Sequence, residues 1–329
     1  MEDAGTLVKY SSADGSEMLL ESVRPTVSDE GSAASSSSTD DSRPKRKSPD
    51  DAAKDGAATK KKKKSKLAYN EYTMDIERFL ELLAPIETAG KKIRDKEIWL
   101  LIGLTGAGKT TTILKLVGIL FKMMEDEYGE DHFEPQELPP ELQEFAVGGG
   151  SVSVTQSIHA VDITLPCGKT ITIVDTPGFG DTKGVEMELA NGAGIINALH
   201  QSKCVKPFLV MNASTMSERR FQAFSDLMDI VTLMMGPNVD YSAFGYLFTN
   251  CSKGKNGSIY KKPAAFLRHN EESMTPQKIS FMKDMIEKTK DGAIVVDPSD
   301  DEDRNELLTE MAATGSIITN PKQHFVNFA

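Results

Sequence analysis

From residue 97 onward, short continuous apolar runs alternate with longer stretches in which apolar residues recur every three or four positions. A continuous run bounded by turn residues predicts a buried strand, and the three-to-four spacing predicts a helix with one apolar face. Strands are predicted at 98–102, 159–165, 170–174, 207–211, 244–249 and 293–296. Helices are predicted at 110–124, 185–200, 218–235, 277–289 and 306–312.

The order of these elements predicts the fold class. Strands that alternate with helices form mostly parallel sheets with helices on both faces. The runs at 159–165 and 170–174 differ, because only the short turn at 166–169 separates them, which is typical of a hairpin. We therefore expect residues 97–329 to form a three-layer α/β domain, with a mostly parallel sheet and one antiparallel edge strand.

A further helical pattern precedes this domain. Apolar residues recur at spacings of three and four along residues 69–83, which predicts an amphipathic helix. Pro85 and Gly90 are expected to end it. Residues 67–96 are therefore predicted to be a helix and a linker, and the helix either packs against the domain or contacts a partner.

The first 66 residues have a different composition. They are rich in Ser, Asp, Ala and Lys and have little apolar clustering, so they cannot offset the entropy cost of ordering and are expected to form a disordered tail. Two basic clusters, at 43–47 and 60–66, suit a bipartite nuclear-import signal read by an import receptor. A solvated linker, or a lysine patch for acidic lipid or RNA, is the alternative.

Charge separates the tail from the rest of the chain. The tail carries 13 Lys/Arg and 12 Asp/Glu, a net charge of +1, whereas residues 67–329 carry 25 and 37, a net charge of −12. An acidic field disfavours sequence-independent binding of nucleic acid by that domain. The sequence has no run of about 18 apolar residues and no secretory leader, which predicts an intracellular protein, cytoplasmic or nuclear.

The strongest motif lies directly after the strand at 98–102. Residues 103–111 match G-x-x-x-x-G-K-[ST], in which glycines let backbone N–H groups converge on phosphate oxygens at a helix N-terminus. Lys109 is expected to reach the β- and γ-phosphates, and the Thr110 hydroxyl to ligate Mg²⁺. With this motif, the three-layer domain at 97–329 is expected to be of the phosphate-loop (P-loop) NTPase type. The residues predicted to hold the nucleotide here are Gly103, Thr105, Gly106, Ala107, Gly108, Lys109, Thr110 and Thr111.

A second motif, Asp175-Thr176-Pro177-Gly178, follows the strand at 170–174. Nucleotide hydrolases place a carboxylate at this point near the metal, so Asp175 is expected to hold Mg²⁺, through water. Gly178 has no side chain and is expected to bring its N–H to the γ-phosphate, which makes it a sensor of that group.

A third residue is needed to complete the metal shell in the triphosphate state. The long acidic stretch at 125–156 is expected to be a functional or mobile loop. Thr155, just before the edge strand, is the hydroxyl best placed to ligate Mg²⁺ there, and an ordinary strand threonine is the alternative. The predicted catalytic set is therefore Lys109, Thr155 and Gly178.

Together these segments resemble a known family. Residues 103–111 and 175–181 are similar to the septin and immunity-associated (AIG-type) branch of the GTPases, which includes the chloroplast-import receptors. Val154-Thr155 and residues 212–250 extend the resemblance, which covers roughly residues 97–255. The resemblance implies binding of GTP or GDP with Mg²⁺, and dimers or oligomers that form across the nucleotide face.

Two departures from the wider GTPase pattern bear on function. Guanine is usually read by the carboxylate of Asn/Thr-Lys-x-Asp, but here the stretch is Thr249-Asn250-Cys251-Ser252. Asn250 either offers an amide to the base or belongs to a simple strand-end turn. Phe179 stands where Ras-like enzymes place a water-positioning Gln. The expected function is a slow, or dimer-assisted, GTPase switch, and the alternatives are a phosphate-loop ATPase or kinase and a nucleotide-binding scaffold.

Overall fold

The computed structural model describes residues 7–11, 17–21, 75–125, 129, 131–145, 158–179, 185–216, 221–235, 240–251, 257–299 and 304–325. The chain divides into two compact units, Met1–Ala68 and Tyr69–Ala329. In the first unit, strands β1 (Leu7–Ser11) and β2 (Glu17–Glu21) pair antiparallel, a hairpin that the sequence analysis does not predict. The rest of the expected disordered tail, including both basic clusters, lies outside the described residues, so those expectations stay predictions.

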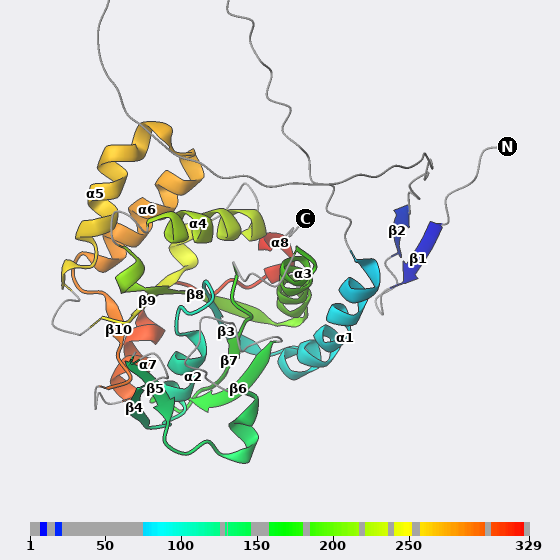
Figure 1. The fold of residues 1–329 in the computed structure, drawn as a ribbon, viewed down its shortest axis with the longest axis horizontal. Coiled ribbons are helices and arrows are strands. Elements are labelled where there is room, and N and C mark those ends of the chain that lie inside the picture. Colours follow the sequence, from blue (N-terminus) through cyan, green and yellow to red (C-terminus); the bar gives the residue numbers. More distant parts are fainter. Residues whose placement is uncertain are drawn as a thin grey trace, which may run out of the picture. The chain divides into compact units, whose positions relative to one another are not determined.

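The second unit is built on a six-stranded sheet with the order β10-β9-β8-β3-β7-β6 (Figure 1). All neighbouring pairs are parallel except β6 and β7, which are antiparallel. This confirms the predicted sheet with one antiparallel edge strand. The strands are β3 (Glu97–Ile102), β6 (His159–Thr164), β7 (Thr170–Asp175), β8 (Cys204–Asn212), β9 (Gly245–Thr249) and β10 (Ile294–Val296).

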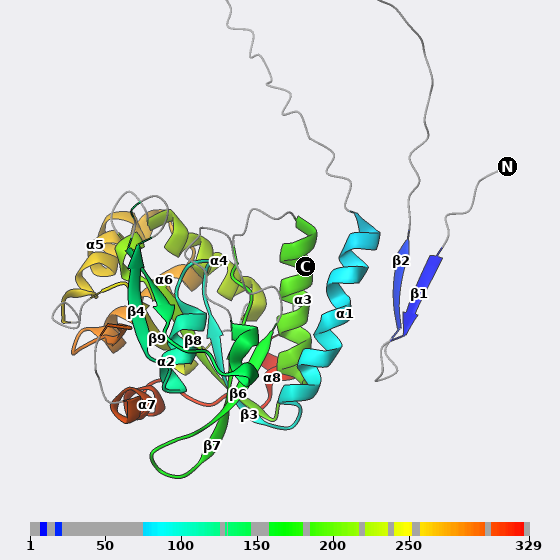
Figure 2. The ribbon, with the colours of Figure 1, turned by 60° about the horizontal axis from the view of Figure 1, so that its bottom comes forward.

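Helices cover both faces of this sheet (Figure 2), which makes the three predicted layers. The α-helices are α1 (Ile76–Ile93), α2 (Lys109–Leu116), α3 (Val185–Gln201), α4 (Phe221–Met235), α5 (Lys261–Asn270), α6 (Pro276–Thr289), α7 (Arg304–Ala313) and α8 (Pro321–His324). Short 3₁₀ turns are η1 (Pro140–Phe145), η2 (Ala213–Met216), η4 (Tyr241–Ala243) and η6 (Glu271–Ser273).

Each sheet face has its own core, because successive side chains of a strand point to opposite faces. In β3, Ile98, Leu100 and Ile102 belong to the core under α1, α3, α4 and α6. Trp99 and Leu101 belong to the core under α2 and α7.

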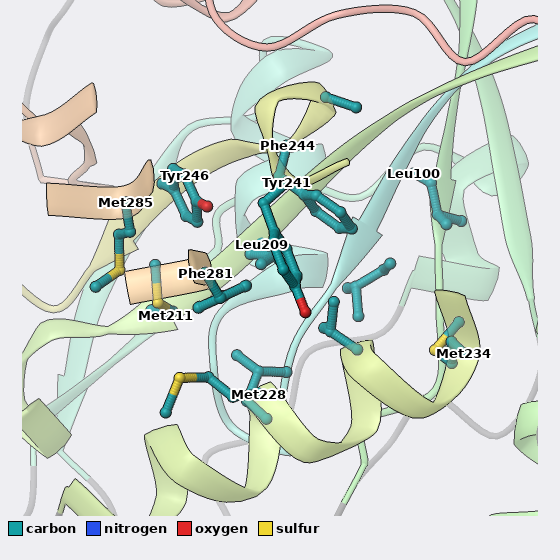
Figure 3. Close-up of a cluster of buried hydrophobic side chains, with 14 of the residues drawn as sticks. Leu100, Leu209, Met211, Met228, Met234, Tyr241, Phe244, Tyr246, Phe281 and Met285 are labelled. Carbon is teal, nitrogen blue, oxygen red and sulfur yellow. The ribbon is translucent and has the colours of Figure 1, made fainter. Parts of the chain in front are cut away.

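The first core contains a group of aromatic rings and methionines between the sheet, α4 and α6 (Figure 3). The ring of Phe281 meets those of Tyr241 and Tyr246 edge-on, with centroids 5.3 and 5.8 Å away. Edge-on contacts of this kind add to the stabilisation from area burial alone.

Helix α1 is longer than the sequence predicts, because it continues through Pro85 and Gly90 to Ile93. It packs along α3, and the two helices lie side by side in both ribbon views (Figures 1 and 2). Gly90 is buried at this contact, where an added Cβ would lie 2.4 Å from the side chain of Gln201. Close packing of two helices therefore outweighs the helix-breaking tendency of these two residues, and the predicted end near Pro85 is wrong.

Helix α2 is shorter than the predicted 110–124. It ends at Leu116, and Gly118 follows in the left-handed conformation with φ 93° and donates its N–H to Lys115 O. A left-handed glycine is a common helix stop. The next residues form β4 (Phe121–Glu125), which pairs antiparallel with β5 (Asp131–Pro135) in a separate two-stranded sheet.

The last described residues are part of the second unit. Ile318 pairs with Val205 beside β8, and Phe325 is fully buried. The ring Nε2 of His200 lies 2.7 Å from the Phe325 carbonyl oxygen. Among the described helices, none has both the length and the apolar content that a membrane crossing requires.

Candidate functional site

The loop between β3 and α2 uses its glycines for different physical reasons. Gly106 and Gly108 have φ values of 74° and 87°, a conformation that residues with a side chain seldom adopt. Gly103 is required by space instead, because an added Cβ would lie 2.5 Å from the Val210 carbonyl oxygen on β8. Apart from its two chain neighbours, no atom of the described residues lies within 4 Å of the Cβ position of Gly106, so the described loop is open there.

Lys109, the first residue of α2, turns its side chain back over this loop. Its Nζ donates to the carbonyl oxygens of Gly103, at 3.0 Å, and Leu104, at 3.1 Å, and only 6% of the residue is exposed. Burial lowers the pKa of Lys109 to about 8, and the charge of Asp175 offsets part of that shift. The charged ammonium is therefore less well stabilised at the loop than it would be in water. An anionic ligand that stabilises this charge would be favoured.

Asp175 and Thr110 bring a carboxylate and a hydroxyl to the same place. Asp175 ends β7, is 0% exposed, and accepts a hydrogen bond from the Thr110 hydroxyl at 2.6 Å. Oxygen ligands of these types suit Mg²⁺. In the described part of the chain, no three His, Cys, Asp or Glu side chains form a group that could hold a metal. A magnesium ion here would therefore need phosphate oxygens and water for its other ligands.

The segment after Asp175 lies directly against the loop. The Thr105 N–H donates to the Phe179 carbonyl at 3.0 Å, and Leu104 and Phe179 form an isolated parallel bridge. An added Cβ on Gly178 would lie 2.5 Å from Thr105 Oγ1 and 2.6 Å from Thr105 Cα. Gly178 therefore has to be a glycine for packing alone, a requirement that the sequence analysis does not find because it depends on a long-range contact.

Thr249 is a site residue that the sequence analysis treats only as part of an incomplete motif. Its hydroxyl donates to the Ala107 carbonyl at 2.7 Å, and its methyl carbon lies 3.0 Å from the Cβ position of Gly108. From the end of β9, Thr249 therefore fixes the part of the loop directly before helix α2. Its place at the head of the Thr249–Ser252 stretch is the signal that could have identified it.

The next residue, Asn250, is exposed and has φ 53°, a conformation that Asn tolerates better than most residues. The neighbouring strand β10 ends beside the residue before Asn250, since its last residue, Val296, pairs with Thr249. Beyond β10, Asp297 Oδ1 accepts from the N–H and hydroxyl of Ser299, at 2.9 and 2.6 Å, in a local turn.

The structure thus brings most of the predicted residues together. Residues 103–111, Asp175 and Gly178 surround one point at the carboxyl ends of β3 and β7. Asn250 lies at the end of β9, and nothing in its described surroundings tests its predicted contact with the base. Thr155 lies outside the described residues, so its role as a ligand stays a prediction.

Comparison with solved structures finds similar chains at low identity. A dimerization-deficient mutant of Toc33 from Arabidopsis thaliana is 16% identical with a TM-score of 0.39, over 72% of this chain and 91% of that chain. A variant of SsGBP is 15% identical with a TM-score of 0.36, over 72% and 64%. Era, in complex with MgGDPNP and part of 16S ribosomal RNA, is 11% identical with a TM-score of 0.36, over 68% and 58%.

No protein-family model matches the sequence, and no curated protein matches it either. The chain spans 64% of the SsGBP chain and 58% of the Era chain. With TM-scores of 0.36–0.39, these likenesses carry no argument about activity. The case for a function therefore rests on the geometry of the site.

Proposed function

We propose that this protein binds GTP with Mg²⁺ at residues 103–111, 175 and 178 and hydrolyses it slowly to GDP and phosphate. The observation that carries the proposal is the meeting of the Lys109 ammonium, the Thr110 hydroxyl and the Asp175 carboxylate at a glycine loop ahead of a helix. A lysine buried at the carbonyls of such a loop has an evident ligand in a polyphosphate.

In this proposal each residue of the site has a separate role in binding the nucleotide or the metal. Lys109 would bind the phosphates, while Thr110 and Asp175 would hold Mg²⁺, with Thr155 as a further proposed ligand in the triphosphate state. When bound, the ion would offset the negative charge of the phosphates. Gly178 would offer its N–H to the γ-phosphate, so that the segment through Phe179 differs between the GTP and GDP states.

The expected rate is slow because of Phe179. This side chain is 2% exposed and belongs to the core under α1, α3, α4 and α6. It has no hydrogen-bonding group, so it cannot position water as a Gln would. We propose that a second copy of the chain, meeting the nucleotide face, raises the rate. Hydrolysis per molecule should then increase with protein concentration, and a flat profile would exclude assistance by a dimer.

One observation keeps ATP as a second candidate substrate. The stretch Thr249-Asn250-Cys251-Ser252 lacks the carboxylate that usually reads guanine. Calorimetric titration of the full chain with GTP and with ATP, each with and without Mg²⁺, decides between the two nucleotides. We expect tighter binding of GTP, in magnesium buffer only.

Single-turnover hydrolysis then separates an enzyme from a scaffold that only holds nucleotide. Lys109→Ala should reduce affinity about a hundredfold or more, because it removes a buried charge-assisted contact. Lys206→Met is the matched control, since Lys206 is also a buried lysine but lies within β8 and donates to Ala312 O. If both variants bound nucleotide as the wild type does, the proposal would be wrong.

A further inference from the structure

The Thr105 hydroxyl has no structural function in the site as described. Its Oγ1 is buried and has no hydrogen-bond partner among the described residues. A buried hydroxyl without a partner costs free energy, and such groups in proteins often have a ligand or a catalytic role. Phe179 leaves the proposed hydrolysis without a group that positions water, so a polar group at this place bears directly on mechanism.

Thr105 lies where the two halves of the site meet. The carbonyl of the preceding residue, Leu104, accepts from the Lys109 ammonium at 3.1 Å. The Thr105 N–H donates to Phe179 O at 3.0 Å. Thr105 is therefore fixed between the lysine that would bind the phosphates and the segment that would sense the γ-phosphate.

The direction of the hydroxyl adds to this. The Cβ position of Gly178 is 2.5 Å from Thr105 Oγ1, so the hydroxyl lies against the glycine whose N–H is expected at the γ-phosphate. Thr105 and Gly106 also line a cavity of ≈ 140 Å³, whose other wall includes Asn212 and Thr215. The lining is mostly apolar, but the volume is large enough for water, and Thr105, Asn212 and Thr215 are polar residues of the lining that could bind it.

We propose that the Thr105 hydroxyl positions the attacking water in GTP hydrolysis, an inference that rests on the proposed function. In this step the water oxygen bonds to the γ-phosphorus, and the bond from that phosphorus to the β–γ bridging oxygen breaks. The electron pair leaves with GDP, and the water proton passes to the phosphate released. Thr105 accepts a hydrogen bond from the water and is not itself a base.

The test compares two substitutions in the full chain. Thr105→Val keeps the branched shape and removes the hydroxyl, whereas Thr105→Ser keeps the hydroxyl and removes the methyl group. We expect Thr105→Val to lower the single-turnover rate with Mg·GTP about tenfold or more. Its affinity for Mg·GDP should stay within about threefold of wild type, and Thr105→Ser should keep a rate within about threefold.

Three results would overturn the inference. They are an unchanged rate in Thr105→Val, an equal loss of rate in both variants, or a loss of Mg·GDP affinity in Thr105→Val as large as its loss of rate. The last would mark Thr105 as a packing residue of the loop. Failure of the wild-type chain to bind Mg·GTP is a separate outcome, which would overturn the proposed function and this inference together.

Discussion

The loop after β3 and the turn after β9 leave the same edge of one sheet, yet they are specified in different ways. The first has its left-handed positions at Gly106 and Gly108 and runs into helix α2. The second has its left-handed position at Asn250, a residue with a side chain. The two are joined by the hydrogen bond from Thr249 to the Ala107 carbonyl.

This difference shows at which positions of the site packing restricts the residue type and at which it does not. Contacts from β7, β8 and β9 surround the loop, so few residue types fit there. The exposed side chain of Asn250 is less constrained, and the carboxylate usual in guanine recognition is missing beside it. Under the proposed function, phosphate binding would be determined by the packing of the loop, and base selection by a few exposed groups.

The largest effect should come from adding a side chain at Gly178, where the segment after β7 packs against the loop after β3. In Gly178→Ala, the new Cβ would displace the backbone of Thr105, because Thr105 Cα and N would lie 2.6 and 2.8 Å away. We expect a loss of about 1–3 kcal/mol in unfolding free energy and about a hundredfold in nucleotide affinity. Denaturant unfolding and calorimetry measure the two. Gly257→Ala is the control and should change neither quantity, because no atom of the described part of the chain, its neighbours aside, lies within 4 Å of the new Cβ.

The charge inside the loop provides a second, smaller test. Because the pKa of Lys109 is about 8 in the free protein, the side chain is mostly neutral at pH 9 and must gain a proton to bind phosphate. Uptake on binding GDP should be about 0.1 proton at pH 7 and about 0.9 at pH 9, with affinity falling at most about tenfold from pH 8 to 9. Calorimetry in buffers of different ionisation heat measures this uptake. Uptake that does not vary with pH would contradict the prediction, and Lys206→Met should leave the profile unchanged.

The same pKa fixes the sign of a stability change in the free protein. In the unfolded chain Lys109 has the ordinary lysine pKa of 10.5, whereas burial lowers the pKa of the folded side chain to about 8. The unfolded state therefore binds more protons in this window, and the contribution of Lys109 to stability rises as the pH increases from about 8.

The hydrogen bond between the two regions can be removed by a substitution at Thr249. Thr249→Val keeps the shape but leaves the buried Ala107 carbonyl without its donor, which should cost about 1–3 kcal/mol in stability. If Thr249 acts on the loop, affinity for GTP and ATP should fall by a similar factor, about fivefold, or about 1 kcal/mol. Thr249→Ser keeps the hydroxyl donor and should retain most of the wild-type stability and affinity. A change confined to one nucleotide would instead place Thr249 at the base.

The smallest effect should come from the turn itself. Asn250→Gly keeps the left-handed conformation and removes the amide, so it separates the two roles left open for this residue. We expect the preference for GTP over ATP to fall by about two- to tenfold, the range of one hydrogen bond. Competition binding with both nucleotides measures it. An unchanged preference would leave Asn250 as a turn residue only.

The sequence predicts the fold and the phosphate side of the site because both depend on local pattern. Strand and helix periodicity, and a motif contained within residues 103–111, need no knowledge of distant contacts. Tertiary packing explains one failure, and a local helix stop explains the other. Helix α1 continues past Pro85 because it lies along α3, and α2 stops early at a left-handed Gly118. The contact of Thr249 with Ala107 joins residues far apart in sequence, so no spacing rule could show it.

One peptide unit, between Leu104 and Thr105, has a consequence for how the protein responds to its ligand. Its carbonyl faces the Lys109 ammonium, and its N–H faces the Phe179 carbonyl. A peptide group is a rigid plane, so it turns as one body. Tilting the oxygen to follow the ammonium also swings the hydrogen away from Phe179. If the protein binds a polyphosphate as proposed, a shift of the Lys109 ammonium toward it would therefore also loosen the hydrogen bond from Thr105 to Phe179.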